Sequence, residues 1–204
     1  MPRIFFDVGA NDGSSMFHHT NNPNNIVYAF EPTRELAAKL RARSAPHNNY
    51  TVIAKAVADY TGKSTFYISG QADWGCSSLN HFADSLQQTW PGRTDFKVTD
   101  SYEVDVIKLE DFVIENNITE IEYLHVDVQG KDLEVLMGLG SKLSIVKAGV
   151  IEMPTSHEKK LYKDQKYLKE DAVKFLEENN FRVTGISSND CFNNECNISF
   201  VRRQ

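Results

Sequence analysis

The sequence contains little cysteine. Its three cysteines, Cys76, Cys191 and Cys196, are spread over 204 residues and include no Cys-x-x-Cys pair. An odd number at these spacings suits neither a disulfide scaffold nor the usual zinc patterns. We therefore expect a protein of a reducing, cytoplasmic compartment.

An excess of positive charge is also missing. Lysine and arginine together number 22 against 28 aspartates and glutamates, which gives a net charge of −6. Proteins that bind nucleic acids normally present a basic face that displaces counterions from phosphates. We expect no nucleic-acid partner.

Long apolar runs are absent too. No stretch approaches the ~20 residues that a helix needs to cross a bilayer. The first residues, Met1 to Asp7, lack the cationic and hydrophobic regions of a signal peptide. These absences predict a soluble protein without membrane insertion.

What is present is an alternation of short apolar runs with amphipathic stretches. Runs that are apolar on both faces indicate buried strands of a parallel sheet, and the stretches between them have the period of helices. Strand, helix, strand order of this kind is typical of right-handed crossovers in a doubly wound sheet. The predicted strands are 4–8, 26–30, 50–57, 121–128 and 145–151, and the predicted helices are 33–43, 109–116, 131–137 and 166–179.

The end of the chain departs from this order. Residues 181–187 and 197–201 both have strand character, and the polar loop between them leaves no room for a crossover helix. This pair predicts an antiparallel hairpin. A mostly parallel, doubly wound α/β sheet that ends in such a hairpin is typical of the Rossmann-like class I methyltransferases, although fold alone does not establish chemistry.

We expect a single domain over residues 1–204, because the length suits one core. The segment 62–106 fits the strand and helix rhythm least. Residues 62–68 look like an added strand, and 70–100 are polar apart from aromatics such as Trp74 and Trp90. A loop of this length is either an acceptor-binding insertion or a disordered excursion, and the aromatics favour the first.

A glycine-containing turn follows the first predicted strand, in residues 6–15. Gly9 and Gly13 allow the backbone to bend sharply and to approach a ligand closely. A nicotinamide site would normally show Gly-x-Gly-x-x-Gly, but Asn11 holds the middle position here. Asp7 and Asp12 disfavour a diphosphate and suit a ligand with an ammonium group, such as S-adenosylmethionine. The alternative is a tight turn without a ligand.

Glu31 ends the second predicted strand. A carboxylate at this place can accept both ribose hydroxyls of an adenosine. Taken alone, Glu31 is equally well explained as an acid favoured at a helix start. Together with the glycine turn, ribose binding is the better explanation.

The ordered motifs resemble those of the FkbM methyltransferases. They are Asp7-Val8-Gly9-Ala10-Asn11-Asp12-Gly13, Phe30-Glu31-Pro32, Ala56-Val57-Ala58-Asp59 followed by Gly62, and Asp127-Val128-Gln129-Gly130 running into Leu133-Glu134-Val135-Leu136-Met137-Gly138. The resemblance implies S-adenosylmethionine, the class I sheet, and methyl transfer to a hydroxyl oxygen of acceptors that include sugars and polyketide-type products.

The resemblance also places Ala56, Val57 and Ala58 beside the adenine, and Ser77-Ser78-Leu79 near the cofactor. The other explanation is a buried strand end and a polar loop. The predicted cofactor-binding residues are Asp7, Gly9, Ala10, Asn11, Gly13, Ser14, Ser15, Glu31, Pro32, Ala56, Val57, Ala58 and Ser78.

The sequence departs from the family pattern in two places. Lys131 follows Gly130 where a small residue is expected, and the chain starts only a few residues before the first predicted strand. We expect either one domain of a longer polypeptide, fused to or working with other glycan-modifying domains, or a minimal enzyme whose lid comes from elsewhere.

The predicted catalytic residues are Asp127, Glu152 and His157. Asp127 ends the fourth predicted strand of the sheet and faces the crevice where open α/β sheets bind ligands. It either acts as general base or holds a divalent cation together with Glu152, and the sequence leaves the metal open. His157 follows the fifth strand, where it can reach an acceptor.

The preferred function is O-methylation of a sugar or similar small molecule. Trp74 and Trp90 offer candidate platforms for a sugar ring. A methyltransferase that acts on nitrogen or RNA is one alternative, and a cofactor-binding module without catalysis is another. A nicotinamide dehydrogenase is the third.

Overall fold

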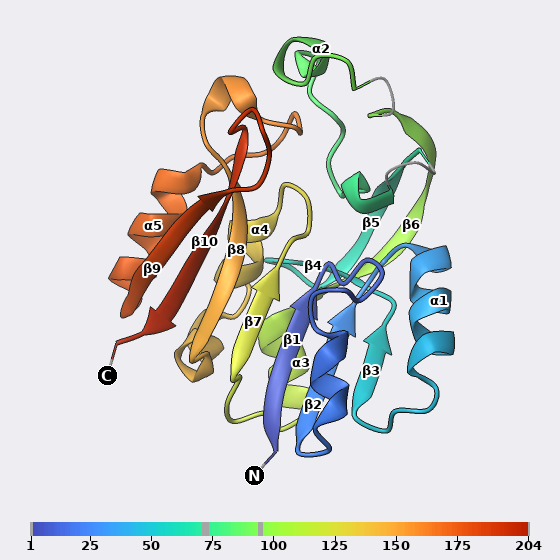
Figure 1. Cartoon of the computed structure of the whole chain (residues 1–204), viewed down its shortest axis with the longest axis vertical. Coiled ribbons are helices and arrows are strands. Elements are labelled where there is room, and N and C mark those ends of the chain that lie inside the picture. The colour runs from blue at the N-terminus through green and yellow to red at the C-terminus, as the bar shows by residue number, and fades with distance from the viewer. Residues whose placement is uncertain (1, 71–73, 94–95, 204) are drawn as a thin grey trace.

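Parallel strands form the centre of the molecule. The computed structural model describes residues 2–70, 74–93 and 96–203, and of Trp74 only the backbone. Its larger sheet has the order β3-β2-β1-β7-β8-β10-β9 (Figure 1). The strands are β1 (Arg3–Val8), β2 (Asn25–Phe30), β3 (Tyr50–Ile53), β7 (Tyr123–Val126), β8 (Ala148–Pro154), β9 (Phe181–Ser188) and β10 (Glu195–Arg202). Strand β10 runs antiparallel to both of its neighbours, and the strands from β3 to β8 run parallel.

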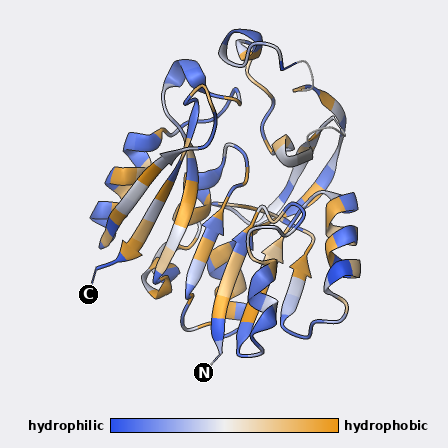
Figure 2. Cartoon of the chain, viewed as in Figure 1, coloured by the Kyte–Doolittle hydropathy of each residue, from blue (hydrophilic) through white to orange (hydrophobic). Residues whose placement is uncertain are grey.

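One face of this sheet is buried under helices, and among the described residues the other face is covered only over β1, β2 and β3. Phe6 and Val8 belong to the core under α3, α4 and α5, whereas Phe5 and Val27 pack with Leu40 of α1 on the other face. Figure 2 shows hydrophobic residues along the strands and polar residues on the outer sides of the helices. The predicted doubly wound α/β fold with a C-terminal antiparallel hairpin is therefore confirmed. The helices are α1 (Arg34–Ser44), α2 (Leu86–Thr89), α3 (Leu109–Glu115), α4 (Asp132–Met137) and α5 (Lys169–Glu178), with 3₁₀ turns η1 (Phe17–Asn21), η2 (Trp74–Cys76), η3 (Gly140–Ile145) and η4 (His157–Lys159).

A second sheet of order β4-β6-β5 lies beside the first. It consists of β4 (Ala56–Ala58), β5 (Gly62–Ser69) and β6 (Val98–Lys108). Its apolar side is a small core that includes Phe66 and Val106. Strand β5 confirms the added strand predicted at 62–68, but the sequence pattern does not predict β6.

The predicted strand 50–57 is wrong as a single element. The chain leaves the larger sheet after Ile53 and enters the second sheet at Ala56. A tight bend separates the two strands, because the N–H of Lys55 donates to the carbonyl oxygen of Ile53 at 2.9 Å. The predicted strand 145–151 is shifted in a similar way, since Ile145 ends the 3₁₀ turn η3 and β8 begins at Ala148.

The described part of the segment 70–100 covers the carboxyl edge of the larger sheet (Figure 1). Leu86, Trp90 and Phe96 pack there against Leu161 and Tyr162. Trp90 is 5% exposed, so it stabilises this segment and offers no open face for a sugar ring. The side chain of Trp74, the other predicted platform, lies outside the described residues.

No helix in the described ranges has both the length and the apolar character needed to cross a membrane.

Candidate active site

The first strand ends in a turn that only glycine fits. Gly9 has a φ of 83°, and a Cβ atom there would lie 1.7 Å from the carbonyl oxygen of Asp127. The N–H groups of Gly9 and Ala10 both donate to the carbonyl oxygen of Phe30, at 3.0 and 2.9 Å. The turn is therefore fixed against the ends of both β7 and β2. Gly13 also has a positive φ, 81°, and a Cβ there would collide with the Leu40 side chain at 2.7 Å.

Glu31 joins this turn to the start of α1. Its carboxylate accepts hydrogen bonds from the N–H of Asn11 and from the N–H of Thr33, both at 2.7 Å. Burial raises the pKa of Glu31 to about 7, and the two N–H groups oppose that rise. Because each carboxylate oxygen carries a second lone pair, Glu31 retains the capacity to accept ribose hydroxyls.

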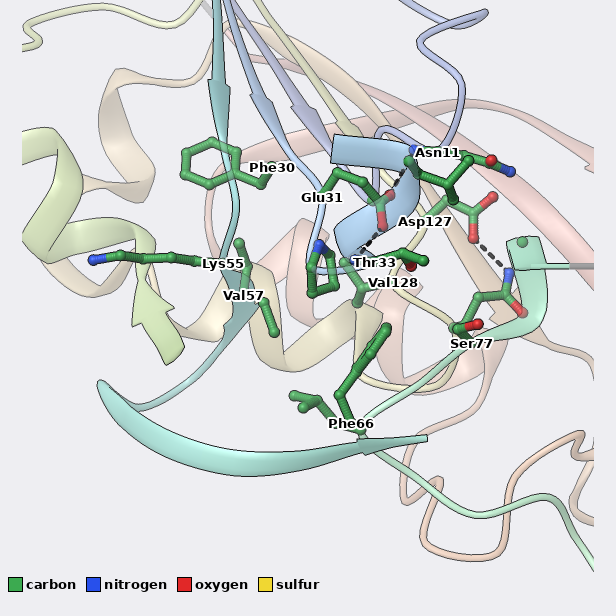
Figure 3. A pocket seen from close by; sticks show the side chains of 17 residues that line it. Asn11, Phe30, Glu31, Thr33, Lys55, Val57, Phe66, Ser77, Asp127 and Val128 are labelled. Carbon is green, nitrogen blue, oxygen red and sulfur yellow. Dashed lines mark hydrogen bonds between the residues drawn. The ribbon is translucent and has the colours of Figure 1, made fainter. Parts of the chain in front are cut away.

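A pocket opens between the glycine turn, the end of β2 and the second sheet. Glu31 and Asp127 both line it, from the ends of strands that flank β1 on either side, and Figure 3 shows these side chains around one space. Apolar side chains form its other walls. The lining residues are Gly9, Asn11, Phe30, Glu31, Pro32, Thr33, Leu36, Lys55, Ala56, Val57, Phe66, Gly75, Ser77, Leu79, Asp127, Val128 and Gln129.

Asp127 and Glu152 share one hydrogen-bond donor. Asp127 follows β7 directly, and its Oδ1 accepts from Nε2 of Gln129 at 2.6 Å. The same Nε2 donates to Oε2 of Glu152, on β8, at 2.8 Å. The other oxygen of Glu152 accepts from the Asn189 side-chain amide. Burial raises the pKa of Glu152 well above its usual value, and the charges of Asp127 and Glu195 raise it further.

Asp132 fixes the shape of the turn after Asp127. Its two carboxylate oxygens accept from the N–H of Val128 at 2.7 Å and the N–H of Gly130 at 2.9 Å. Burial raises the pKa of Asp132 to about 7, the Asp127 charge adds to this, and the two N–H groups oppose it. This bonding supports φ angles of 61° at Gln129 and 98° at Gly130.

Asp7 is paired beneath the glycine turn and does not line the pocket. Its Oδ1 lies 2.9 Å from Nδ1 of His125. Burial raises the pKa of the Asp7 carboxyl, although His125 opposes the rise. Burial would lower the pKa of His125, but its hydrogen bond to Asp7 and the Asp7 charge outweigh burial and raise it. Asp7 therefore contacts His125 and not the space of the pocket.

A sequence-family model described as "Methyltransferase FkbM domain" matches residues 7–183. The chain belongs to the FkbM methyltransferase family.

Two O-methyltransferases are similar to about two thirds of this FkbM-family chain. The 2-O-methyltransferase NoeI of Sinorhizobium fredii (strain NBRC 101917 / NGR234) is 27% identical over 141 residues, 66% of this chain and 56% of that protein. The 31-O-demethyl-FK506 methyltransferase FkbM of Streptomyces tacrolimicus is 29% identical over 153 residues, 67% of this chain and 59% of that protein. The match thus spans less than two thirds of either relative.

Solved structures show the same fold at low identity. Fibrillarin of Aeropyrum pernix, with S-adenosyl-L-methionine bound, has a TM-score of 0.53 at 9% identity and matches 98% of this chain and 66% of that one. The magnesium protoporphyrin IX methyltransferase ChlM of Synechocystis PCC 6803 has a TM-score of 0.51 at 11% identity and matches 99% and 71%. This FkbM-family chain therefore has the class I methyltransferase fold.

The structure brings part of the predicted site together. The predicted residues that line the pocket are Gly9, Asn11, Glu31, Pro32, Ala56, Val57 and Asp127. Those outside its lining are Asp7, Ala10, Gly13, Ser14, Ser15, Ala58, Ser78, Glu152 and His157.

The residues outside the lining hold different positions. Ser14 and Ser15 are exposed, and Ser15 lines a separate groove on the sheet face. Ala58 is fully buried in the core of the second sheet. Ser78 lies beneath the pocket, where its Oγ donates to the Gln129 carbonyl oxygen at 2.5 Å. His157 is exposed at the start of η4, so its catalytic role stays a prediction.

The described residues contain no group of three or more His, Cys, Asp or Glu side chains that could hold a metal ion. Between Asp127 and Glu152 lies the Gln129 amide, which donates to both carboxylates. This arrangement does not fit the shared divalent cation that the sequence left open.

Sequence reasoning missed two residues at the catalytic end. Gln129 belongs to the Asp127–Gly130 motif, so its position was visible in the sequence although its role was not. The hydroxyl of Tyr162 lies 2.7 Å from Oε1 of Gln129, and no sequence signal links residues that are 33 positions apart.

Proposed function

We propose that this chain is an S-adenosylmethionine-dependent O-methyltransferase that acts on a hydroxyl group of a sugar or similar small molecule. The observation that carries the proposal is that Glu31 and Asp127 line one pocket. One carboxylate is placed for a ribose and the other for an acceptor hydroxyl. The O-methyltransferase names of NoeI and FkbM support oxygen as the acceptor atom.

The pocket fits an adenosine-containing cofactor. The Cβ-free backbone at Gly9 leaves room for a close approach, Glu31 can accept ribose hydroxyls, and Phe30, Val57 and Phe66 supply an apolar wall for a purine. The strand end and the turn carry the acids Asp7 and Asp12, which disfavour a diphosphate. S-adenosylmethionine, when bound, supplies a methyl group that is already activated as part of a sulfonium.

The remaining task of the protein is to orient the acceptor and to remove its proton. Asp127 is the candidate general base, because its carboxylate lines the pocket and its position is fixed by the turn and by Gln129. The Asp127 carboxylate would take the proton of the acceptor hydroxyl, while the hydroxyl oxygen would bond to the methyl carbon and the carbon–sulfur bond of the sulfonium would break to leave a neutral thioether. Positioning of this kind supplies much of the rate of a bimolecular transfer.

We assign the acceptor to the space under the segment 70–100. This segment, the loop that carries Tyr162 and the β9–β10 loop meet over Asp127 and Glu152. Side chains with hydrogen-bonding capacity, such as Ser77 and Asp127, line the pocket there. Polar groups of this kind suit an acceptor with several hydroxyls.

The test combines cofactor binding with an acceptor screen. The purified chain should bind S-adenosylhomocysteine but not NAD in calorimetry, and mass spectrometry should show one added methyl group on saccharides or other hydroxylated small molecules. Asp127→Asn should lower kcat by about 10²-fold or more and leave S-adenosylhomocysteine affinity nearly unchanged. Asp105→Asn, at an exposed aspartate of β6, is the matched control and should behave as the wild type. Tight NAD binding, or methylation of RNA alone, would overturn the proposal.

A further inference from the structure

Gln129 occupies an unusual position between the two carboxylates of the site. Its backbone has a φ of 61°, in the left-handed region that residues other than glycine and asparagine seldom adopt. The residue is only 9% exposed. Its carbonyl oxygen accepts from Ser78 Oγ at 2.5 Å. Backbone and side chain are both fixed, and a strained residue held this way indicates a functional constraint.

The Gln129 amide uses its nitrogen for two acidic partners. Nε2 donates to Oδ1 of Asp127 at 2.6 Å and to Oε2 of Glu152 at 2.8 Å, and Figure 3 marks the first bond with a dashed line at Asp127. A primary amide has two N–H groups, so both are used. The amide thus holds two carboxyl groups together that would otherwise repel each other when ionised.

Tyr162 contacts the oxygen end of the amide. Its hydroxyl lies 2.7 Å from Gln129 Oε1 and 2.9 Å from the carbonyl oxygen of Cys76, and the residue is 1% exposed. The hydroxyl has a single proton, which it donates to one of these two oxygens at a time. When it donates to Oε1, it favours the orientation in which Nε2 faces Asp127 and Glu152. Gly130 makes this packing possible, because a Cβ there would lie 2.8 Å from Cδ2 of Tyr162.

From this arrangement we propose that Gln129 is the positioning residue of the site: it orients Asp127 toward the acceptor, and Tyr162 keeps its amide in the working orientation. The inference rests on the proposed role of Asp127 as general base. It adds that a neutral amide donor, and not a histidine or a metal, orients the Asp127 carboxylate. Through Tyr162 and Cys76, the orientation of Asp127 is also linked to the loops that cover the acceptor space.

The first test is independent of turnover. In an NMR spectrum of ¹⁵N-glutamine-labelled protein, the Gln129 side-chain amide is assigned by its loss in Gln129→Leu. Both of its protons should lie downfield of those of a free glutamine and exchange slowly. In Tyr162→Phe they should shift toward free-glutamine values, whereas Tyr28→Phe, a tyrosine without this contact, should leave them in place. Free-glutamine values in the wild type would overturn the arrangement.

The second test is kinetic and uses three variants at position 129. Gln129→Asn keeps the amide and suits a positive φ, but its shorter side chain cannot reach both carboxylates. We expect it to lower kcat by about 10- to 100-fold, and Gln129→Leu to do the same. Gln129→Glu places a third carboxyl in the cluster, so the acidic limb of the kcat profile should move to higher pH by about one unit.

These outcomes separate a positioning role from a merely structural one. A structural role predicts lower melting temperatures and weaker S-adenosylhomocysteine binding in proportion to the lost activity, with an unchanged pH profile, and that result would overturn the proposal. Rescue by Gln129→Asn to wild-type kcat would overturn it as well. If the wild type methylates no hydroxyl acceptor, the proposed function fails, and the NMR result still decides the role of the amide.

Discussion

At the scale of single residues, Gly9 shows how one position is constrained both by the turn after β1 and by the end of β7. Its positive φ alone favours glycine, and the Asp127 carbonyl leaves no room for a Cβ atom. Gly92 has nearly the same φ, 84°, but a Cβ atom there would meet no other atom within 4 Å among the described residues. A comparison of the two glycines therefore separates the energetic cost of a positive φ from the cost of a steric clash with a Cβ atom.

We expect Gly9→Ala to be far more harmful than Gly92→Ala. Alanine at Gly92 carries only the cost of a left-handed backbone, about 1 kcal/mol. Alanine at Gly9 must in addition push the end of β7 away, and with it Asp127. Thermal unfolding should show a larger loss for Gly9→Ala, and calorimetry should show lost affinity for S-adenosylhomocysteine. Equal effects of the two substitutions would contradict this account.

The residue scale also shows the limit of reading the site from sequence. Gly9, Glu31 and Asp127 could be found because turn chemistry and strand ends place them by local rules. The partners of Gln129 and Glu152 could not, since Tyr162 and Asn189 reach the site through loops whose paths depend on tertiary packing. For Asp7 the sequence is misleading in the other direction. Its motif predicts a contact with the ligand, but in the structure its side chain is buried beside His125.

At the scale of elements, apolar patterns identified the central strands but not every break between them. The run 50–57 is apolar on both sides of the bend at Lys55, so its periodicity hides the passage from one sheet to the other. Strand β6 was missed because most residues of its first half are exposed and polar, and its pairing with β5 is not encoded in a local pattern. Both strand assignments depend on hydrogen bonds to strands that are distant in the sequence, and such pairing is not visible in the local residue pattern.

The described part of the segment 70–100 is held to the loop 155–168 by two backbone hydrogen bonds and a small apolar core. The N–H of Ala83 donates to the carbonyl oxygen of Leu161 at 2.8 Å, and the N–H of Lys163 donates to that of His81 at 2.9 Å. Trp90 belongs to the apolar cluster beside these two hydrogen bonds. As a large buried side chain, it contributes to holding this cover in place.

Trp90→Ala should loosen this cover without unfolding the sheets. Removing a buried aromatic ring typically costs about 3–5 kcal/mol, and here the loss falls on the cover. In hydrogen exchange, the amides of Ala83 and Lys163 should exchange at least about tenfold faster, while that of Leu124 in the central strand stays protected. Phe192→Ala is the control, because Phe192 is also an aromatic near Trp90 but is 47% exposed. Equal acceleration at all three amides would mean that the whole fold, and not the cover, had weakened.

At the scale of the whole molecule, several buried aspartates and glutamates lie in and around the candidate site. Burial raises the pKa of Asp7, Glu31, Asp132, Glu152 and Glu195, the last to about 8. A carboxyl whose pKa is higher in the folded state binds its proton more tightly there. Its contribution to stability is complete below the unfolded value and is lost as the pH rises toward the folded value.

The other shifted groups in the described chain do not cancel this trend near neutral pH. The raised pKa of His125 acts in the same direction, because its folded form also keeps a proton to higher pH. The lowered pKa values of Asp12, Glu110 and Glu158 matter only below about pH 4.5. His19, whose pKa is lowered by burial, opposes the trend as a single group.

The ligand-free protein should therefore lose stability as the pH rises from about 4.5 to about 8. One pKa unit corresponds to about 1.4 kcal/mol, so several buried acids should lower the free energy of unfolding by at least a few kcal/mol over this range. Calorimetric melting at constant ionic strength measures the slope. Glu195→Gln removes one contributor and should flatten it, whereas Glu158→Gln, at an exposed glutamate, should follow the wild type. A melting temperature that stays level or rises across this range would show that the acids of the site are paired more fully than their burial implies.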